Sequence, residues 1–255
     1  MKISIITLFP EVFSPILNSS ILGRAQKKGK VSFEFVNLRD FGEGTHKTVD
    51  DKPFGGGVGM VLKANVLAKA WESIVQGSEF RVQGNRNKNQ KSPNSQPLTP
   101  HPLTILMSAS GVPYSQQKAK DLSKLDHLII ICGHYEGVDQ RFIEKYVDEE
   151  FSVGDYVLTG GEIPAMVVVD SICRLIPGVL AKPEAIDNES FSNSSLVTLH
   201  SSPLLEHPHY TRPQVFEGEK VPDVLTSGNH QEIKKWCQEK SIEKTRRLRP
   251  DLIKN

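Results

Sequence analysis

The sequence predicts an α/β protein with a mainly parallel sheet, followed by a small helical C-terminal domain. Three observations lead to this class. Strand-like and helix-like segments alternate over the first 180 residues, which is typical of parallel strands joined by crossover helices. The run Leu128–Cys132 is short and continuously apolar, as in a strand buried on both faces. After Leu180 the chain becomes polar and loses its periodicity, so a second domain is expected there.

The individual elements follow from the same patterns. Apolar runs predict strands over residues 2–8, 31–38, 104–108 and 128–132. Apolar residues at helical spacing predict helices over residues 12–27, 63–75, 114–125 and 162–176. Pro164 is tolerated because it falls in the first turn of the last of these helices. In the C-terminal part, Ser227-Gly228-Asn229 indicates a further helix start, and Ile233, Trp236 and Cys237 form a small apolar face.

Two domains are predicted. Residues 1–180 form the first, residues 181–188 a flexible linker, and residues 189–255 a basic, helical second domain. From Lys234 to Asn255 there are eight Lys or Arg residues and three acids, so positive charge gathers here in a chain whose net charge is only +1. Residues 81–103 are rich in Asn, Gln, Ser and Pro and contain no acidic residue, which predicts a disordered surface insertion.

The composition argues against several other classes. The three cysteines have neither CxxC nor zinc-finger spacing, and the eight histidines form no HxxxH or HExxH pattern, so no metal site is predicted. Such cysteine usage suits a reducing compartment. The apolar start of the chain is too short for a signal sequence, and no apolar run approaches the roughly 20 residues of a membrane helix. We therefore expect a cytoplasmic protein that does not enter a membrane.

Two glycine-rich loops carry most of the polar side chains that could contact a ligand. Gly133–Gly137 follows the buried strand directly, and Ser152–Gly161 precedes a helix. In open α/β sheets, ligands bind at the carboxyl ends of strands, so a ligand site is expected here. Glu136 lies between two glycines of the first loop, and it is interpreted equally well as a ligand contact or as a solvated surface group.

Three further motifs allow two interpretations each. Gly55–Gly59 is either a flexible turn or a backbone that passes close to a ligand; no Lys-Ser/Thr follows, so it is not a P-loop. Asp170 and Arg174 are four residues apart, so they share one helix face. Either they form an ion pair, or Asp170 holds Arg174 so that its guanidinium faces a developing negative charge. Glu189, by its polar surroundings alone, is a solvated linker residue.

Taken in order, these motifs closely resemble the bacterial tRNA (guanine-N1)-methyltransferase family, TrmD, of the knotted SPOUT class. Together they are far more specific than any single glycine loop. The matching segments span nearly the whole chain: Leu8–Pro10, Pro53–Met60, Gly133–Gly137, Gly154–Glu162, Ile176–Leu180 and His209–Pro213.

The resemblance implies a deep trefoil knot whose loops bind S-adenosylmethionine, an obligate homodimer with an active site shared between subunits, and tRNA as the substrate. The implied reaction methylates N1 of guanosine at position 37, just 3′ of the anticodon. The implied cofactor-binding positions are Met107, Ser108, Gly111, Gly133, Tyr135, Glu136, Gly137, Ser152, Val153, Gly154, Asp155, Tyr156, Val157, Leu158, Gly160 and Gly161.

Two of the three catalytic candidates also come from the resemblance. Arg174 matches the arginine that stabilises charge on the guanine O6, and Glu136 is a further candidate. Glu189 stands in a Glu-Ser-Phe sequence where the family has Asp-Ser-Phe, so it is the candidate general base, with Asp187 as the alternative. A requirement for a divalent ion such as magnesium has no readable signature in the sequence.

The chain departs from the family pattern in other places. Ala109 stands where a proline is common, residues 81–103 are an insertion, and there are extra residues around 197–202. Two other classes of protein explain the sequence less well. A Rossmann enzyme would have a glycine fingerprint after the first strand, where this chain has Leu8-Phe9-Pro10. A non-catalytic RNA-binding protein would account for the basic C-terminal part but not for the glycine loops between Gly133 and Gly161.

Overall fold

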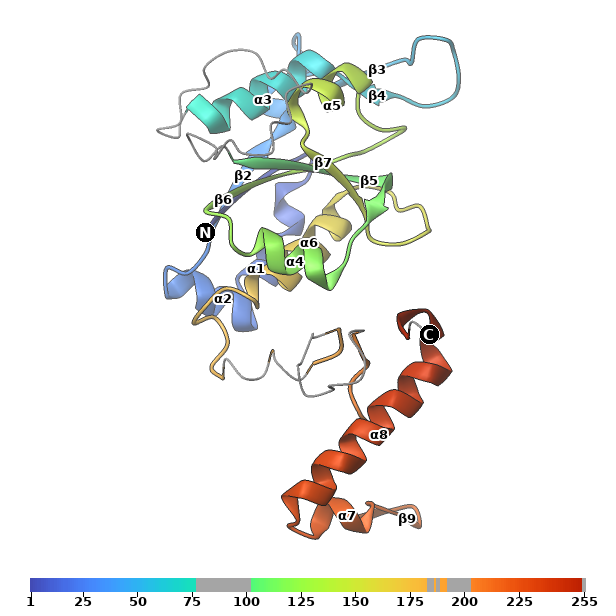
Figure 1. Cartoon of the computed structure of the whole chain (residues 1–255). Coiled ribbons are helices and arrows are strands. Elements are labelled where there is room, and N and C mark those ends of the chain that lie inside the picture. Colours follow the sequence, from blue (N-terminus) through green and yellow to red (C-terminus); the bar gives the residue numbers. More distant parts are fainter. Residues whose placement is uncertain (77–101, 183–185, 187–188, 192–202, 254–255) are drawn as a thin grey trace, which may run out of the picture. The chain divides into compact units, whose positions relative to one another are not determined.

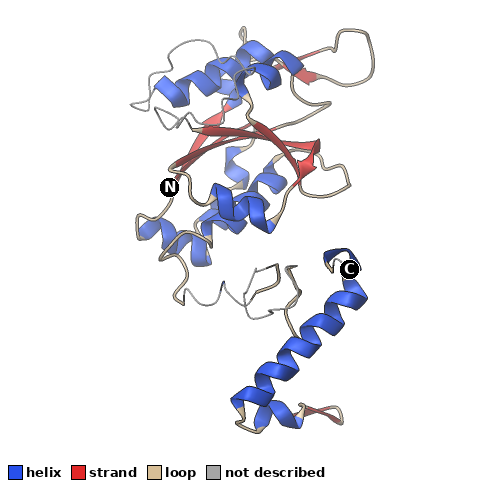
Figure 2. Ribbon diagram, in the orientation of Figure 1, coloured by secondary structure: helices blue, strands red, loops and turns tan. Residues whose placement is uncertain are grey.

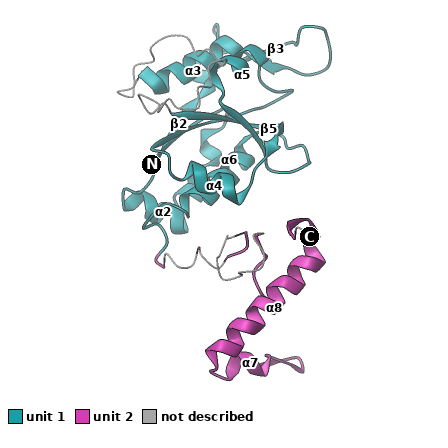
Figure 3. Cartoon of the chain, in the orientation of Figure 1, with its two compact units in different colours: residues 1–180 teal, residues 181–255 magenta. Residues whose placement is uncertain are grey.

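The computed structural model describes residues 1–76, 102–182, 186, 189–191 and 203–253. They belong to two compact units, Met1–Leu180 and Ala181–Asn255 (Figure 3). Residues 81–101 of the predicted insertion and much of the predicted linker lie outside the described residues. The last two residues of the predicted insertion were placed wrongly. Pro102 is buried and Leu103 begins a strand, because Leu103 pairs with Leu128 in the sheet.

The first unit is built on a parallel sheet of five strands in the order β2–β1–β6–β5–β7 (Figure 1). This confirms the predicted α/β class. All six residues of β6 are buried, since this strand lies between β1 and β5 with helices over both of its faces. The strand bounds are Lys2–Thr7 (β1), Ser32–Asn37 (β2), Leu103–Pro113 (β5), His127–Cys132 (β6) and Glu149–Ser152 (β7).

Helices cover both faces of the sheet (Figure 2). On one side lie α3 (Ala64–Gln76) and α5 (Gln140–Tyr146), and a short β3 (Asp50–Asp51)–β4 (Val61–Leu62) hairpin precedes α3. The other side carries α1 (Ser14–Leu17), α2 (Ser20–Lys27), α4 (Gln116–Leu122) and α6 (Glu162–Cys173). Two 3-10 helices, Pro10–Val12 and Leu38–Phe41, complete the described elements of this unit.

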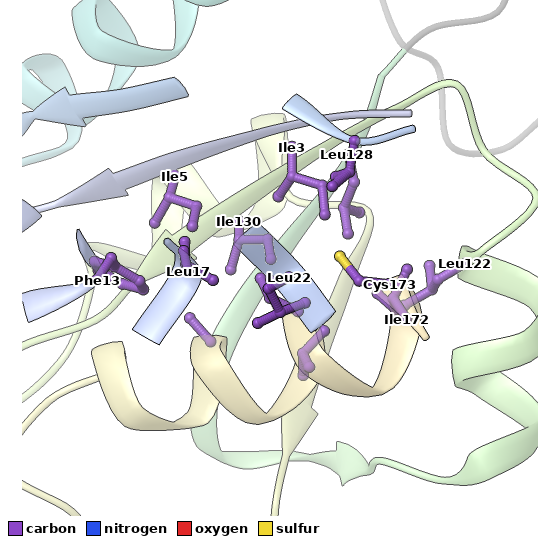
Figure 4. Close-up of a cluster of buried hydrophobic side chains, with 14 of the residues drawn as sticks. Ile3, Ile5, Phe13, Leu17, Leu22, Leu122, Leu128, Ile130, Ile172 and Cys173 are labelled. Carbon is purple, nitrogen blue, oxygen red and sulfur yellow. The ribbon is translucent and has the colours of Figure 1, made fainter. Parts of the chain in front are cut away.

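The core explains why β6 is apolar at every position. Leu128 and Ile130 pack with Ile3 and Ile5 of β1 against the helices of one side (Figure 4). Their neighbours Ile129 and Ile131 belong to the second cluster, against α3 and α5. A strand with helices on both faces has no polar side, so the usual alternation disappears.

Several predicted elements differ from those observed. The helix expected over residues 12–27 is broken after Leu17, where Ser19 Oγ donates to the Ile16 carbonyl oxygen (2.8 Å) and competes with helical bonding. The helix expected over residues 162–176 ends at Cys173, which leaves Arg174 just past its last residue. Helix α5 and strand β7 had no predicted counterpart, because each is too short to show a period.

The second unit is small, and its longest element is a helix. A two-stranded hairpin, β8 (Val215–Phe216) and β9 (Glu219–Lys220), leads into α7 (Asp223–Thr226) and the long α8 (His230–Leu248), followed by a 3-10 turn at Pro250–Leu252. Asn229 caps α8 by accepting from the N–H groups of Gln231 and Glu232, which confirms the predicted helix start. In the described part of the chain, no helix combines the length and apolar character needed to cross a membrane.

Candidate active site

The carboxyl ends of the three neighbouring strands β6, β5 and β7 surround a cavity. Three loops line it: residues 107–110 within β5, residues 133–137 after β6, and residues 152–154 and 156–161 after β7. Because the strands are parallel and adjacent, these loops emerge at one edge of the sheet. The cavity has a volume of about 490 Å³, which is within the usual range for a site that holds a small organic molecule.

A bulge in β5 forms the first loop. Met107 and Val112 both pair with Phe151, so the residues between them leave the sheet. The hydroxyl groups of Ser108 and Ser110 are hydrogen-bonded to each other across the bulge, with an Oγ–Oγ distance of 2.8 Å. A Cβ on Gly111 would lie 2.6 Å from the Phe151 backbone nitrogen, so only glycine lets the returning chain pass β7 this closely.

The second loop is a tight turn at the end of β6. Gly137 N–H donates to the His134 carbonyl oxygen (3.1 Å), and Tyr135 adopts a positive φ of 59°. Glu136 is tied to the Gly55–Gly59 motif, because its N–H donates to the Met60 carbonyl oxygen at 3.0 Å. Gly59 has a φ of 95°, and a Cβ there would collide with the Glu136 carboxylate. The glycine motif therefore reaches the cavity through Glu136.

The third loop runs back against the second. Gly161 N–H donates to the Gly133 carbonyl oxygen (2.8 Å), and Gly160 forms a bridge with His134. Ser152 Oγ donates to the Gly154 carbonyl oxygen (2.8 Å) and fixes the start of this loop. These hydrogen bonds hold the second and third loops together where both line the cavity.

A group of buried polar side chains lies beneath these loops. Thr7 Oγ1 at the end of β1 donates to Glu162 Oε1 (2.8 Å) and accepts from the Phe9 N–H (3.0 Å). Burial raises the pKa of the Cys132 thiol well above its usual value, and the nearby Glu162 carboxylate raises it further while a hydrogen bond with Thr7 lowers it. The Cys132 thiol therefore stays protonated and is not a nucleophile. The Nδ1 atom of His134 is buried without a hydrogen-bond partner in the described part of the chain.

Fourteen predicted cofactor-binding residues line the cavity. They are Met107, Ser108, Gly133, Tyr135, Glu136, Gly137, Ser152, Val153, Gly154, Tyr156, Val157, Leu158, Gly160 and Gly161. The predicted residues Gly111 and Asp155 are not among the lining residues. Residues that were not predicted also contribute, for example Leu106, Gln140, Ile143 and Pro164. Gln140 and Ile143 belong to α5, the helix that the sequence pattern did not reveal.

The whole chain is similar to known proteins. The family model described as tRNA (Guanine-1)-methyltransferase TrmD matches residues 1–255. The chain belongs to the TrmD family. A relative from Anoxybacillus flavithermus, named tRNA (guanine-N(1)-)-methyltransferase, is 49% identical over 253 residues, which cover 99% of this chain and 91% of the relative. The protein of that name from Ruminiclostridium cellulolyticum is 47% identical over 253 residues, covering 99% and 96%.

Two of the three predicted catalytic residues of this TrmD-family chain do not line the cavity. Only Glu136 does. Arg174 caps the C-terminal end of α6, whereas Gly161 at the N-terminal end lines the cavity. Twelve helical residues separate these positions, which are about 20 Å apart along the helix axis. Glu189 belongs to the second unit, and Asp187 lies outside the described residues.

The Thr7–Glu162 contact gives a testable prediction. Thr7→Val removes the donor to a buried carboxylate and the acceptor of the Phe9 N–H, so we expect the free energy of unfolding to fall by about 1–3 kcal/mol. Urea denaturation followed by circular dichroism measures this loss. Thr226→Val at the exposed end of α7 is the matched control, expected to change stability by less than about 0.5 kcal/mol. Equal midpoints for both variants would contradict the proposed role of Thr7.

Proposed function

We propose that this protein transfers the methyl group of S-adenosylmethionine to N1 of guanosine at position 37 of tRNA. The observation that carries the proposal is the cavity walled by three glycine-containing loops at one sheet edge, in a chain matched over its whole length by the TrmD family. Relatives named tRNA (guanine-N(1)-)-methyltransferase match 99% or more of this chain, so the similarity covers both units.

The cavity suits the methyl donor by its size and by its surface. Gly133, Gly160 and Gly161 line it, and the buried Nδ1 of His134 lacks a partner among the described groups. S-adenosylmethionine supplies a methyl group already activated by its sulfonium charge. The protein must therefore align guanine N1 with that methyl, remove the N1 proton, and stabilise the charge that moves to O6. We assign proton removal to Glu189 and O6 stabilisation to Arg174.

The proposal includes a homodimer in which a second copy completes the site. The support is that Arg174 lies at the far end of α6 from the cavity of its own chain. In addition, Ile163 and Val167 are apolar, are four residues apart on one face of α6, and are 55% and 47% exposed. Packing that face against a second copy would cover it.

The proposal also includes the deep trefoil knot, supported by the close contact of residues 160–161 with residues 133–134.

The second unit is proposed to hold the tRNA. Lys234, Lys235, Arg246 and Arg247 of α8 are exposed, and such cations bind phosphate oxygens without reading sequence. This unit would supply affinity for tRNA, and the cavity of the first unit would be the place of methyl transfer.

A cytoplasmic location is proposed as well, because that is where tRNA is modified and where three unpaired cysteines remain reduced.

One experiment separates the proposal from a non-catalytic RNA-binding protein. Calorimetry with S-adenosylmethionine alone, without RNA, should give saturable binding of one donor per cavity. Mass analysis of a tRNA transcript incubated with protein and donor should then show one added methyl at N1 of guanosine 37. A protein that binds the tRNA but takes up no donor would be the RNA-binding alternative.

A further inference from the structure

The β3–β4 hairpin carries an unusual loop, residues 52–60. Phe54 is 99% exposed and Val58 is 92% exposed. Single exposed apolar residues are common, but two on one nine-residue loop with its base beside a ligand cavity require an explanation. Gly55, Gly56, Gly57 and Gly59 all have positive φ, so the backbone between the two apolar residues is bent in a way that other residues resist.

The base of the loop is fixed at the mouth of the cavity. Asp51 pairs with Val61 in the hairpin, and the Leu62 N–H donates to the Gly137 carbonyl oxygen at 2.9 Å. Gly59 packs against the side chain of Glu136, which lines the cavity. Phe54 and Gly59 are five residues apart, so their Cα atoms are separated by at most about 17 Å. Phe54 therefore lies in the neighbourhood of the cavity, on a loop whose base is fixed beside a cavity-lining residue.

We propose that Phe54 stacks on a nucleobase of the substrate RNA next to the methylated guanosine. This inference rests on the proposed function, since it takes the acceptor to be RNA. Phe54 is followed by three glycines, which leave the faces of its ring open. Stacking requires one aromatic ring and tolerates any base, because every base has a π face. Lys52, two residues earlier, is exposed, and we assign it to a backbone phosphate of the same RNA.

A second copy of the chain is a weaker explanation of the same ring. Stable protein interfaces bury about 800 Å² on each partner, whereas the apolar part of this loop consists of two side chains. One ring and one cation are enough for a nucleotide, and they are far too little for a subunit interface.

The test compares variants at position 54 in direct tRNA binding. Phe54→Ala is expected to weaken tRNA affinity by roughly 5- to 150-fold, the range found for loss of one base–aromatic contact. Phe54→Leu keeps an apolar side chain but no ring, so it should lose nearly as much, whereas Phe54→Trp should retain affinity. Val58→Ala, on the same loop, is the matched control and should bind tRNA like the wild type. All four variants should bind S-adenosylmethionine and unfold as the wild type does.

Salt dependence distinguishes stacking from charge. Phe54→Ala should leave the slope of log affinity against log salt unchanged, whereas Lys52→Ala should reduce its magnitude by about 0.7 to 0.9, as for one lost phosphate contact. If the wild type methylates tRNA but Phe54→Ala or Phe54→Leu binds it normally, the stacking role is overturned and the proposed function stands. A Phe54→Ala protein with a changed mass in solution would overturn it in favour of a contact between copies. A wild type that does not methylate tRNA would instead contradict the proposed function.

Discussion

Glu189→Ala is expected to reduce the single-turnover rate of tRNA methylation by roughly 10²-fold or more, while S-adenosylmethionine affinity stays near that of the wild type. The size follows from the loss of a positioned general base. Affinity for the donor should not change because Glu189 belongs to the second unit and does not line the cavity of the first. Rapid-quench methylation with enzyme in excess measures the first quantity, and calorimetry measures the second.

The structure supplies a reason to expect a fixed position for this carboxylate. The two residues that follow it are anchored within the second unit. The Ser190 Oγ accepts from the Glu206 N–H (3.0 Å), and the Phe191 N–H donates to the Leu204 carbonyl oxygen (3.0 Å). Arg249 lies over the Phe191 ring, 5.8 Å from its centroid. Glu189 therefore sits at the end of an ordered turn, and a base held in place is a more effective catalyst than a mobile one.

Matched variants decide which carboxylate acts. Glu189→Asp keeps the charge on a shorter side chain and should retain much more activity than Glu189→Gln, which keeps the size but not the base. Asp187→Ala should be mild in the same assay. If Asp187→Ala abolished single-turnover methylation while Glu189→Ala remained close to wild type, the assignment of the base would be wrong by two residues.

Local patterns in the sequence were sufficient for the parts of the fold that depend on local physics. The continuous apolar run of β6 and the cap at Asn229 were both predicted, because burial on two faces and helix capping leave marks within a few residues. The break after Leu17 was missed because side-chain bonds from Ser19 and Gln26 to the preceding turn outweigh the helical period.

The buried polar contact beneath the cavity loops could not be predicted from any local sequence pattern. Thr7 and Glu162 are 155 residues apart in the chain and meet only because β1 and α6 pack together. In the same way, the Gly55–Gly59 motif was open to two interpretations until its contact with Glu136 was visible. Gly111 was expected to contact the donor, yet its space is needed by the backbone of β7. A glycine in a motif thus marks a close approach, but the sequence does not say to what.

That distinction leads to a prediction about three glycines. Gly161→Ala should both destabilise the protein and weaken S-adenosylmethionine binding, each by about 1–3 kcal/mol, the usual cost of overpacking. The residue has an ordinary φ of −81°, so backbone strain plays no part. The reason is steric: an added Cβ would lie 2.7 Å from the Cys132 Cα and 2.8 Å from the Gly133 nitrogen, and neither backbone atom can rotate away.

Two control glycines separate the two effects. At Gly133 the nearest backbone atom to an added Cβ is the Met107 carbonyl oxygen, at 3.3 Å, so Gly133→Ala should lose much less stability than Gly161→Ala and still lose donor affinity. At Gly23, in α2 away from the cavity, a Cβ would collide with the Asn18 carbonyl, so Gly23→Ala should lose stability and keep donor affinity. Calorimetry and thermal denaturation of the three proteins test the whole pattern. Wild-type donor affinity in both Gly133→Ala and Gly161→Ala would mean that S-adenosylmethionine does not bind in this cavity.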